Sequence, residues 1–149
     1  MLIKNANLED LNAIEIIGKN SLPIYYNLYN LQLFFYDKNH NILSVFVNDI
    51  IIGFIIYEIK LNSYHIKSLA IYLPYRNKGY GEEILYYLKN MLIKYNLKFI
   101  SLFIKSKNNI LKKFYKKNKF INHCIMEKYY TSLDYNDGEE LRWYNEKNK

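Results

Sequence analysis

The chain has 149 residues, half of them hydrophobic and 17% aromatic, so it can bury a sizeable core and is too apolar to be disordered. Its single cysteine, Cys124, excludes an internal disulfide and a cysteine-based zinc site, which favours a reducing compartment. The longest apolar run, Ile50–Tyr57, is too short to cross a bilayer, and the N-terminus does not have the pattern of a signal peptide. We therefore expect a soluble protein with no membrane partner, located in the cytoplasm, with the nucleus as the alternative.

The formal net charge of +7 suggests a nucleic-acid partner. Nearly all basic residues are lysines, however, with only Arg76 and Arg142 as arginines, and asparagine, isoleucine and tyrosine are also abundant. This composition is typical of coding DNA rich in A and T, which raises the lysine content without any polyanionic partner. We expect no DNA partner and keep a nucleic-acid-binding module only as an alternative.

The first half of the chain shows helical patterns followed by strand patterns. Asn7 is a typical helix N-cap, and apolar residues at helical spacing lead from it to Gly18, which we expect to end the helix. Asn48-Asp49 is a polar pair typical of a β-hairpin turn. The predicted elements are a strand at 2–4, helices from Asn7 to Gly18 and from Ser21 to about Tyr36, and strands at 42–47, 51–61 and 64–73.

The last of these strands leads into a basic, glycine-containing turn and then into a helix. Pro74 ends the strand because proline lacks a backbone N–H. Gly79 and Gly81 permit backbone conformations closed to other residues and let the main chain approach a ligand closely. The N–H groups of the turn and first helical turn have no intrahelical partner, so together with Arg76 and Lys78 they suit a pyrophosphate. The alternative is a plain strand-to-helix turn, since the motif matches neither the Walker loop nor the dinucleotide fingerprint.

The second half of the chain continues the alternation of helices and strands. The helical pattern that follows the glycines has one apolar stripe, and the next strand pattern is apolar enough to be buried on both faces. We find no internal repeat, linker or domain boundary, so the sequence predicts one mixed α/β domain over residues 1–149. The predicted elements are a helix at 82–95, a strand at 99–105, a short helix capped by Asn108 or Asn109, and two strands within 121–144 around the turn at 136–138.

Two motifs resemble signatures of the GCN5-related N-acetyltransferases (GNAT). Arg76-x-x-Gly79-x-Gly81 after an apolar strand resembles the acetyl-CoA motif of that family. The segment 114–120, which begins Phe114-Tyr115 and ends in a phenylalanine, resembles a second signature, although the family usually has glycine at the position of Lys119. The order of elements is similar to the GNAT fold over the whole chain. This resemblance implies an α/β fold with a mainly antiparallel central sheet flanked by helices.

Within the family, the chain is most similar to N-terminal protein acetyltransferases of the NatE catalytic-subunit type. Short motifs at residues 22–26 and 129–130 resemble the two substrate loops of that type. The resemblance implies transfer of acetyl from acetyl-CoA to a protein N-terminal α-amine by direct attack in a ternary complex. Protein or peptide N-termini would be the substrates, with an auxiliary subunit or the ribosome as a further partner. The implied substrate-binding residues are Leu22, Pro23, Tyr26, Lys67, Tyr129 and Tyr130.

The same resemblance implies where acetyl-CoA binds, without any metal. The backbone of residues 69–71 would hydrogen-bond the pantetheine arm and help to stabilise an oxyanion, while the turn would hold the pyrophosphate. The simpler interpretation of residues 69–71 is a core strand, and that of the C-terminal lysines is a solvated face. The implied acetyl-CoA-binding residues are Leu69, Ala70, Ile71, Arg76, Asn77, Lys78, Gly79, Tyr80, Gly81, Glu82, Asn108, Tyr115 and Lys117.

Attack of an amine on a thioester needs a proton acceptor and a proton donor for the leaving thiolate. Tyr115 stands where the family has its thiol-facing tyrosine and is the candidate general acid, unless it is one more packed aromatic. For the base, the family type is expected to use a tyrosine on the strand before the glycine turn and a histidine on the next strand. Here His65 and Phe103 occupy those positions. We hypothesise that His65 accepts the ammonium proton through a water, because an unperturbed histidine pKa near 6.5 suits a base; the alternative is a packed or surface histidine.

Three alternatives to the N-terminal acetyltransferase follow from these residues. The enzyme could acetylate a lysine side chain or a small amine instead of an α-amine. The chain could also be a catalytically silent GNAT-like subunit of an acetyltransferase complex, which the loss of the expected histidine at Phe103 favours.

Overall fold

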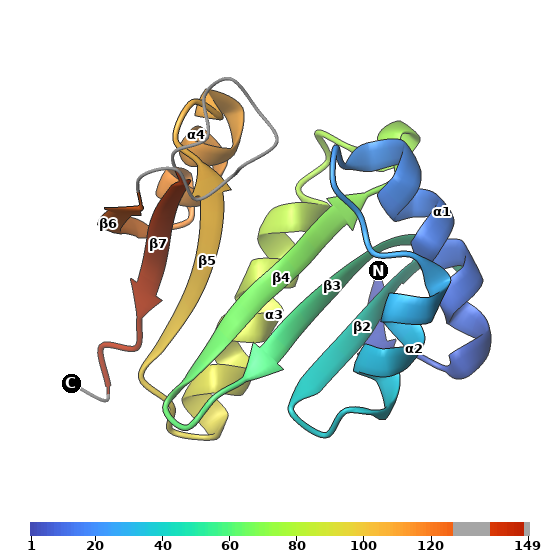
Figure 1. Ribbon diagram of the computed structural model, residues 1–149, viewed down its shortest axis with the longest axis horizontal. Helices are drawn as coiled ribbons and strands as arrows, with labels where there is room; N and C mark the ends of the chain where they lie inside the picture. The colour runs from blue at the N-terminus through green and yellow to red at the C-terminus, as the bar shows by residue number, and fades with distance from the viewer. Residues whose placement is uncertain (127–137, 148–149) are drawn as a thin grey trace. The chain divides into compact units, whose positions relative to one another are not determined.

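The computed structural model describes residues 1–126 and 138–147 of the chain (Figure 1). Two short 3₁₀ turns, Leu8–Asp10 and Leu73–Tyr75, accompany the helices and strands of this part. None of its helices is both long and apolar enough to cross a membrane. The elements are β1 (Leu2–Asn5), α1 (Leu11–Ser21), α2 (Leu28–Tyr36), β2 (His40–Val47), β3 (Ile50–Ile59), β4 (Ser63–Ile71), α3 (Tyr80–Lys94), β5 (Phe99–Lys105), α4 (Asn109–Lys117), β6 (Ile121–Met126) and β7 (Gly138–Tyr144).

The described strands form a seven-stranded sheet in the order β1-β2-β3-β4-β5-β7-β6. Four of the neighbouring pairs are antiparallel: β1 with β2, β2 with β3, β5 with β7, and β6 with β7. The left-handed backbone of Asn48 and Asp49, with φ of 50° and 64°, makes the tight turn between β2 and β3. The predicted fold class, mixed α/β with a mainly antiparallel sheet, is therefore confirmed.

The chain falls into two compact units. The first contains residues 1–60 and 66–87, and the second contains residues 61–65 and 88–149. Two elements contribute residues to both units. Residues of β4 up to His65 belong to the second unit and the later ones to the first, whereas residues of α3 up to Tyr87 belong to the first unit and the later ones to the second. The prediction that residues 1–149 form one domain stays a prediction.

In the first unit, α1 and α2 lie against β2 and β3 (Figure 1). Of the four apolar positions that predicted the first helix, Leu11, Ile14 and Ile17 are buried in one cluster with residues of the sheet. The fourth, Leu8, lies in the preceding 3₁₀ turn and is exposed. Truncation of a fully buried leucine or isoleucine such as these to alanine typically costs about 2–5 kcal/mol. Burial of this stripe is therefore what holds α1 on the sheet.

Two predicted helix boundaries were wrong. Gly18 does not end the first helix, which continues to Ser21; a Cβ at Gly18 would lie 3.5 Å from Cβ of Tyr25 and 3.6 Å from the Phe54 ring. The second helix begins at Leu28 instead of Ser21. Proline disfavours helical backbone in the residue before it, so Pro23 excludes Leu22 from a helix, and Leu22 is extended with φ −124° and ψ 140°.

The strands β3 and β4 leave no room for a side chain at Gly53 of β3. A Cβ added there would lie 2.8 Å from the Ala70 carbonyl oxygen and 2.7 Å from Cδ1 of Ile71, both on β4. No side chain fits without a shift of the backbone, so glycine at this position sets the spacing of β3 and β4. The predicted fourth strand ends at Ile71, two residues earlier than expected, and Pro74 lies in the 3₁₀ turn that follows.

In the second unit, the end of α4 is fixed by contacts from α3. The Lys89 ammonium donates to the Asn118 carbonyl oxygen at 2.6 Å and lies over the rings of Phe120 and Trp143, 5.6 and 5.1 Å from their centroids. The chain leaves α4 through Lys119, whose φ of 72° is left-handed. This explains why the family prefers glycine here: the turn needs a conformation that a side chain disfavours.

Candidate active site

The glycine turn of the first unit connects β4 to α3 through left-handed backbone. Asn77 has φ of 60° and Gly79 has φ of 85°. Asparagine tolerates this region, whereas most other side chains are strained in it. A Cβ at Gly79 would meet no atom of the protein within 4 Å, so the main chain there borders open space. The turn therefore leaves room for a ligand beside the backbone at Gly79, and binding there stays a prediction.

The charges at this turn act in opposite directions. Arg76 Nε donates to the Ile71 carbonyl oxygen at 2.8 Å, so this arginine braces the turn against the end of β4. Glu82 and Glu83 lie in the first turn of α3, where carboxylates stabilise the helix through its dipole but oppose a bound anion. An anion at this helix start would therefore depend on backbone N–H groups, Arg76 and the exposed Lys78.

Residues 69–71, predicted to contact the pantetheine arm, form the end of β4. Ala70 is buried in the core of the first unit, and Leu69 and Ile71 are half-buried. They are core strand residues, as the simpler interpretation holds. Their backbone could still bind a ligand, since side-chain burial leaves that possibility open.

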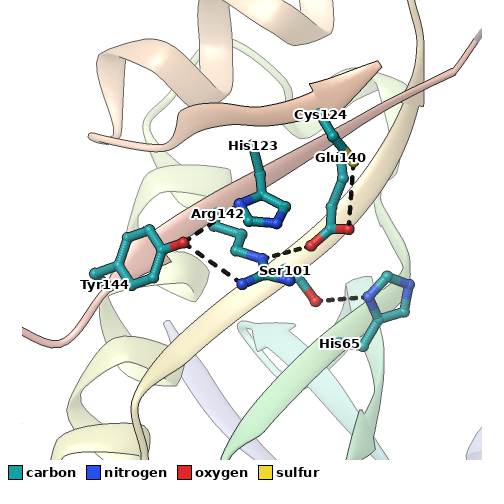
Figure 2. Close-up of polar contacts among 7 residues, drawn as sticks. All are labelled: His65, Ser101, His123, Cys124, Glu140, Arg142 and Tyr144. Carbon is teal, nitrogen blue, oxygen red and sulfur yellow. Dashed lines mark hydrogen bonds and ion pairs between the residues drawn. The ribbon is translucent and has the colours of Figure 1, made fainter. Parts of the chain in front are cut away.

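His65 is the third residue of β4, and the first three residues of this strand belong to the second unit (Figure 2). Its side chain is buried, with 7% exposure, and its Nδ1 lies 2.7 Å from Oγ of the buried Ser101 on β5. The ring also packs on Phe103, with 4.4 Å between ring centroids. The residue that replaces the expected histidine thus forms one wall around His65. His65 is not a surface histidine.

The sequence analysis did not single out Ser101. Strand alternation places residues 101 and 103 on the same face of β5, and this is the signal that could have identified it. A serine in an apolar strand is conspicuous only when its partner is known. That partner comes from a strand 36 residues earlier in the chain.

Tyr115 lies on α4 in the second unit and is buried, with 4% exposure. Its ring makes edge-to-face contacts with Phe114 and Phe120, with centroid distances of 5.0 and 5.3 Å. Burial raises the pKa of the Tyr115 hydroxyl above its ordinary value near 10. The phenol therefore stays protonated at neutral pH, as a proton donor must.

Asn108 and Lys117 mark the two ends of the same helix. Asn108 is the N-cap of α4, for which the sequence predicted either Asn108 or Asn109. The Oδ1 of Asn108 accepts a hydrogen bond from the Leu111 N–H at 3.1 Å. That oxygen supports α4, so any ligand contact would need another atom of Asn108. Lys117 is exposed in the last helical turn.

A second group of polar side chains follows β6 and β7 (Figure 2). Arg142 and Glu140 lie opposite Ser101 and Phe103 in the β5–β7 register, and Arg142 Nε donates to Glu140 Oε2. The guanidinium also lies over the Phe99 ring, 4.1 Å from its centroid. Glu140 is thus neutralised by Arg142, which makes it a poor candidate for a free base.

Cys124 and His123 complete this group. The exposed Cys124 has its Sγ 3.9 Å from Glu140 Oε1. His123 Nδ1 lies 3.5 Å from the Tyr144 hydroxyl on the exposed edge strand. Within residues 1–126 and 138–147, no group of three or more His, Cys, Asp or Glu could hold a metal ion, and the expected absence of a metal stays a prediction.

The predicted substrate residues lie in three places. Leu22 and Tyr26 pack partly against the core of the first unit, and Pro23 is exposed between them, all in the non-helical connection of α1 and α2. Lys67 lies on β4 with its ammonium 4.0 Å from Glu58. Tyr129 and Tyr130 lie outside the described residues.

The mixed α/β fold is that of an N-acetyltransferase, and the comparison with protein families agrees. Residues 8–120 match the model described as the acetyltransferase (GNAT) family. This is most of the chain, so the chain belongs to that family. It is an N-acetyltransferase, an acyltransferase that uses acetyl-CoA.

Individual proteins support the family but differ from this chain in sequence. An uncharacterized N-acetyltransferase of Methanocaldococcus jannaschii is 27% identical over 142 residues, which cover 94% of this chain and 87% of that protein. The structure of the ribosomal-protein-S18-alanine N-acetyltransferase from Escherichia coli has a TM-score of 0.87 at 18% identity, covering 96% of this chain and 92% of that one.

Two further solved structures show how widely the fold is used. Arabidopsis thaliana Naa50, in complex with the bisubstrate analogue CoA-Ac-MVNAL, has a TM-score of 0.80 at 22% identity, with coverage of 95% and 97%. A chimera of the spermidine N-acetyltransferase from Vibrio cholerae has a TM-score of 0.82 at 17% identity, with coverage of 97% and 96%. At such identities the likeness shows the fold and leaves the amine substrate open.

Proposed function

We propose that this enzyme transfers acetyl from acetyl-CoA to the free α-amine of a protein N-terminus, as an N-terminal acetyltransferase of the NatE catalytic-subunit type. The observation that carries this proposal is the loop between α1 and α2. Its motif, Leu22-Pro23-Ile24-x-Tyr26, resembles the first substrate loop of that type, and the loop is ordered without being helical.

Hydrogen bonds hold this loop at both ends. The Leu22 N–H donates to the Gly18 carbonyl oxygen at 2.9 Å, and the Leu28 N–H donates to the Glu15 carboxylate. Tyr26 adds an edge contact to Phe34, with 4.9 Å between ring centroids. Because the loop is held in place, a peptide would bind it without a large ordering cost.

The exposed side chains of the loop suit a peptide. Ile24 is 62% exposed and Tyr25 is 38% exposed, next to the exposed Pro23. Tyrosine offers an apolar wall together with a hydroxyl that can bond to a peptide backbone. Exposed apolar and tyrosine side chains of this kind favour a peptide chain over a small, highly charged polyamine.

For acetyl-CoA, the glycine turn would hold the pyrophosphate with its backbone N–H groups and with Arg76 and Lys78. The open space beside Gly79 fits this use, because a bulky anion can reach the main chain there. Asn108 and Lys117, at the two ends of α4, would contact other parts of the molecule. When bound, acetyl-CoA supplies an activated thioester carbonyl.

The side chains of the second unit would handle the protons. His65 would take a proton from the attacking ammonium through a water, and Tyr115, which burial keeps protonated, would donate to the leaving thiolate. The Phe103 side chain offers no proton-accepting atom, so His65, whose ring packs on it, is the proposed base.

Two other functions would use the same fold. Acetylation of a lysine side chain or a small amine needs the same chemistry, and the spermidine enzyme with this fold illustrates it. A silent subunit that binds CoA or a partner enzyme would need no base, and Phe103 favours that alternative. An auxiliary subunit or the ribosome would be a further partner of the proposed enzyme.

Release of free thiol from acetyl-CoA by the purified protein tests the proposal. The amines are peptides with varied free N-termini, an N-terminally blocked peptide with one lysine, and spermidine. We expect turnover on free N-termini alone. Turnover on the blocked peptide or on spermidine would instead establish the second function. Thermal stabilisation by CoA without any turnover would indicate a silent subunit or a missing partner.

A further inference from the structure

We propose that exposed lysines of α4 and of the turns on either side of it bind the phosphate backbone of double-helical RNA. This set of lysines, the basic face, consists of Lys107, Lys113, Lys116 and Lys119. Lys117 is exposed as well but is left out, because it is assigned to acetyl-CoA. The inference goes beyond acetyl transfer, since it concerns a surface that would hold the enzyme on an RNA and not the amine that it modifies.

The net charge of the chain is divided unequally between the two units. Residues 1–60 and 66–87 contain 7 basic and 8 acidic residues, whereas residues 61–65 and 88–149 contain 14 basic and 6 acidic ones. The formal charge is therefore −1 in the first unit and +8 in the second. Coding DNA rich in A and T would raise the lysine content of both units. It does not explain a positive charge confined to one of them, which is a distribution typical of polyanion binding.

Within the second unit, the positive charge is concentrated around α4. Seven of the 21 basic residues of the chain lie between residues 105 and 119, and residues 84–126 contain no aspartate or glutamate. Glu139 of β7 reaches α4, but its carboxylate is paired at 3.1 Å with Lys112, which is not part of the basic face. The segment that contains α4 therefore has a strong positive charge that no acid of the same segment offsets.

The two sides of α4 differ in burial. Tyr115 is buried, with 4% exposure, and its ring contacts those of Phe114 and Phe120. Lys113 and Lys116 are exposed, and a spacing of three residues places them on the same side of the helix. Because the packed side fixes the helix, a polyanion would meet lysines on a backbone that is already ordered, which lowers the cost of binding.

The extent of the basic face suits consecutive phosphates better than a single one. The nine residues of α4 correspond to a helix about 13 Å long, with Lys107 before it and Lys119 after it. One phosphate group of CoA could contact only part of such a surface. Consecutive phosphates of a nucleic acid could contact all of it, and each neutralised phosphate adds to the affinity because counterions are released.

The residue types of α4 indicate backbone contacts to a double helix. Base readout relies largely on arginine, asparagine and glutamine, and in α4 the only exposed residue of these types is Asn109. Single strands are bound mainly by stacking on exposed aromatic rings, whereas the two aromatic residues of α4, Phe114 and Tyr115, pack on each other. Lysine is a compact point charge, which suits phosphates without any reading of the sequence. We therefore expect binding that does not depend on the RNA sequence.

RNA is the source of phosphates that agrees with the proposed function, and this choice rests on it. An enzyme that acetylates protein N-termini meets its substrates where proteins are made, beside folded RNA. A membrane surface agrees less well, because a helix that lies on a bilayer inserts an apolar face, and that face of α4 is packed around Tyr115. On the lysine side, Ile110, which is 84% exposed, is the one large apolar residue.

Fluorescence anisotropy with a labelled RNA hairpin, whose stem has about 16 base pairs, tests the inference in the unmodified protein. We expect a Kd of about 10⁻⁴–10⁻⁶ M at physiological salt. Between about 50 and 200 mM salt, log K should fall with log salt with a slope of about −3, as expected for three or four phosphate contacts. Saturating CoA should leave the RNA bound. The comparison ligands are a DNA hairpin of the same sequence and vesicles of anionic lipid.

A double variant, Lys113→Gln with Lys116→Gln, tests the basic face itself. Glutamine has nearly the helix propensity of lysine, so the Tm should not change. We expect RNA affinity at 100 mM salt to fall about tenfold or more and the salt slope to become less steep by about 1.8. The KM for acetyl-CoA should stay the same. Lys113→Arg with Lys116→Arg keeps both charges and should bind RNA like the unmodified protein.

The matched control is Lys19→Gln with Lys38→Gln in the first unit, where both lysines are also exposed. It removes the same two charges from the chain, so it separates the basic face from net charge. We expect its RNA affinity to stay within about twofold of that of the unmodified protein and its salt slope to be unchanged.

Five results would overturn the inference. They are no RNA binding at 50 mM salt, an equal loss of affinity in the control and in the Lys113/Lys116 variant, displacement of the RNA by CoA, tighter binding of the DNA hairpin, or binding of anionic vesicles but not of RNA. None of these readouts depends on turnover. If RNA binds as expected but the acetylated amine is a lysine or spermidine, the inference holds and the α-amine proposal fails.

Discussion

The glycine turn and the surroundings of His65 differ in the atoms that they offer to a ligand. The turn uses main chain: left-handed backbone at Asn77 and Gly79, open space where a Cβ would be, and N–H groups at a helix start. The surroundings of His65 use individual side-chain atoms, namely one ring nitrogen, one hydroxyl and one aromatic wall.

This difference explains which part follows the family pattern and which departs from it. A site built from backbone depends on a few positions where only glycine or asparagine is comfortable, so its motif persists in the sequence. A site built from side chains can move a function to another strand, provided that the new residue is buried and oriented. Here the histidine stands on β4 and not on β5, and its Nδ1 is hydrogen-bonded to Ser101 Oγ.

The largest effect on turnover should come from the side chains proposed to move protons, His65 and Tyr115. Tyr115→Phe removes the hydroxyl and keeps the ring contacts, so we expect kcat to fall about 10²–10⁴-fold with little change in Tm. Because burial raises the pKa of this hydroxyl, it loses its proton only above the ordinary tyrosine range. The pH profiles of the two proteins between pH 6 and 9 should therefore have the same shape, as measured by thiol release. A variant with near-normal kcat would remove Tyr115 from the chemistry.

His65→Ala should lower kcat by about 100-fold or more. The matched control is His40→Ala, since His40 is a partly buried histidine whose Nδ1 lies 2.9 Å from the carboxylate of Asp37 in the first unit. The control should keep kcat near that of the unmodified protein. Full turnover of His65→Ala across pH 6 to 9 would end the assignment of His65 as the base.

A substitution in the glycine turn should change acetyl-CoA binding and protein stability more than the rate of the chemical step. Gly79→Ala places a Cβ at φ 85°, which costs about 1–2 kcal/mol, and should raise the KM for acetyl-CoA more than it changes kcat. Gly18→Ala is the contrasting control, because its Cβ meets ordinary contacts and alanine favours a helix interior by about 1 kcal/mol. Thermal unfolding should thus move in opposite directions for the two variants. A Gly79→Ala protein with unchanged Tm and KM would contradict the backbone assignment.

The smallest effect concerns the turn after α4. Lys119→Gly should relieve the left-handed strain at φ 72° and stabilise the protein by about 0.5–1 kcal/mol, a rise of about 2–4 °C in Tm at most. Asn96→Gly, at φ 59°, should have less effect because asparagine tolerates this conformation better. A lower Tm for Lys119→Gly would show that the lysine side chain stabilises the turn by more than its backbone conformation costs.

Local patterns predicted most of the fold. Apolar periodicity, the hairpin pair Asn48-Asp49 and the N-cap Asn108 agree with the structure because each acts within a few residues. The two wrong helix boundaries differ in cause, because the second follows from Pro23, a local signal that the helical pattern outweighed in the prediction. Gly18 resembles a helix end in sequence, yet α1 continues through it to Ser21.

The features of the candidate site also divide into those that the sequence predicted and those that only the structure shows. The sequence by itself determined the family, the turn that suits a pyrophosphate, and the residue types at His65 and Tyr115, because these lie in contiguous motifs with fixed spacing. Only the tertiary structure decided that Tyr115 is buried and that His65 is held between Ser101 and Phe103. Those properties depend on which strands are neighbours and how deeply each side chain is buried, and both arise from contacts between residues far apart in the chain.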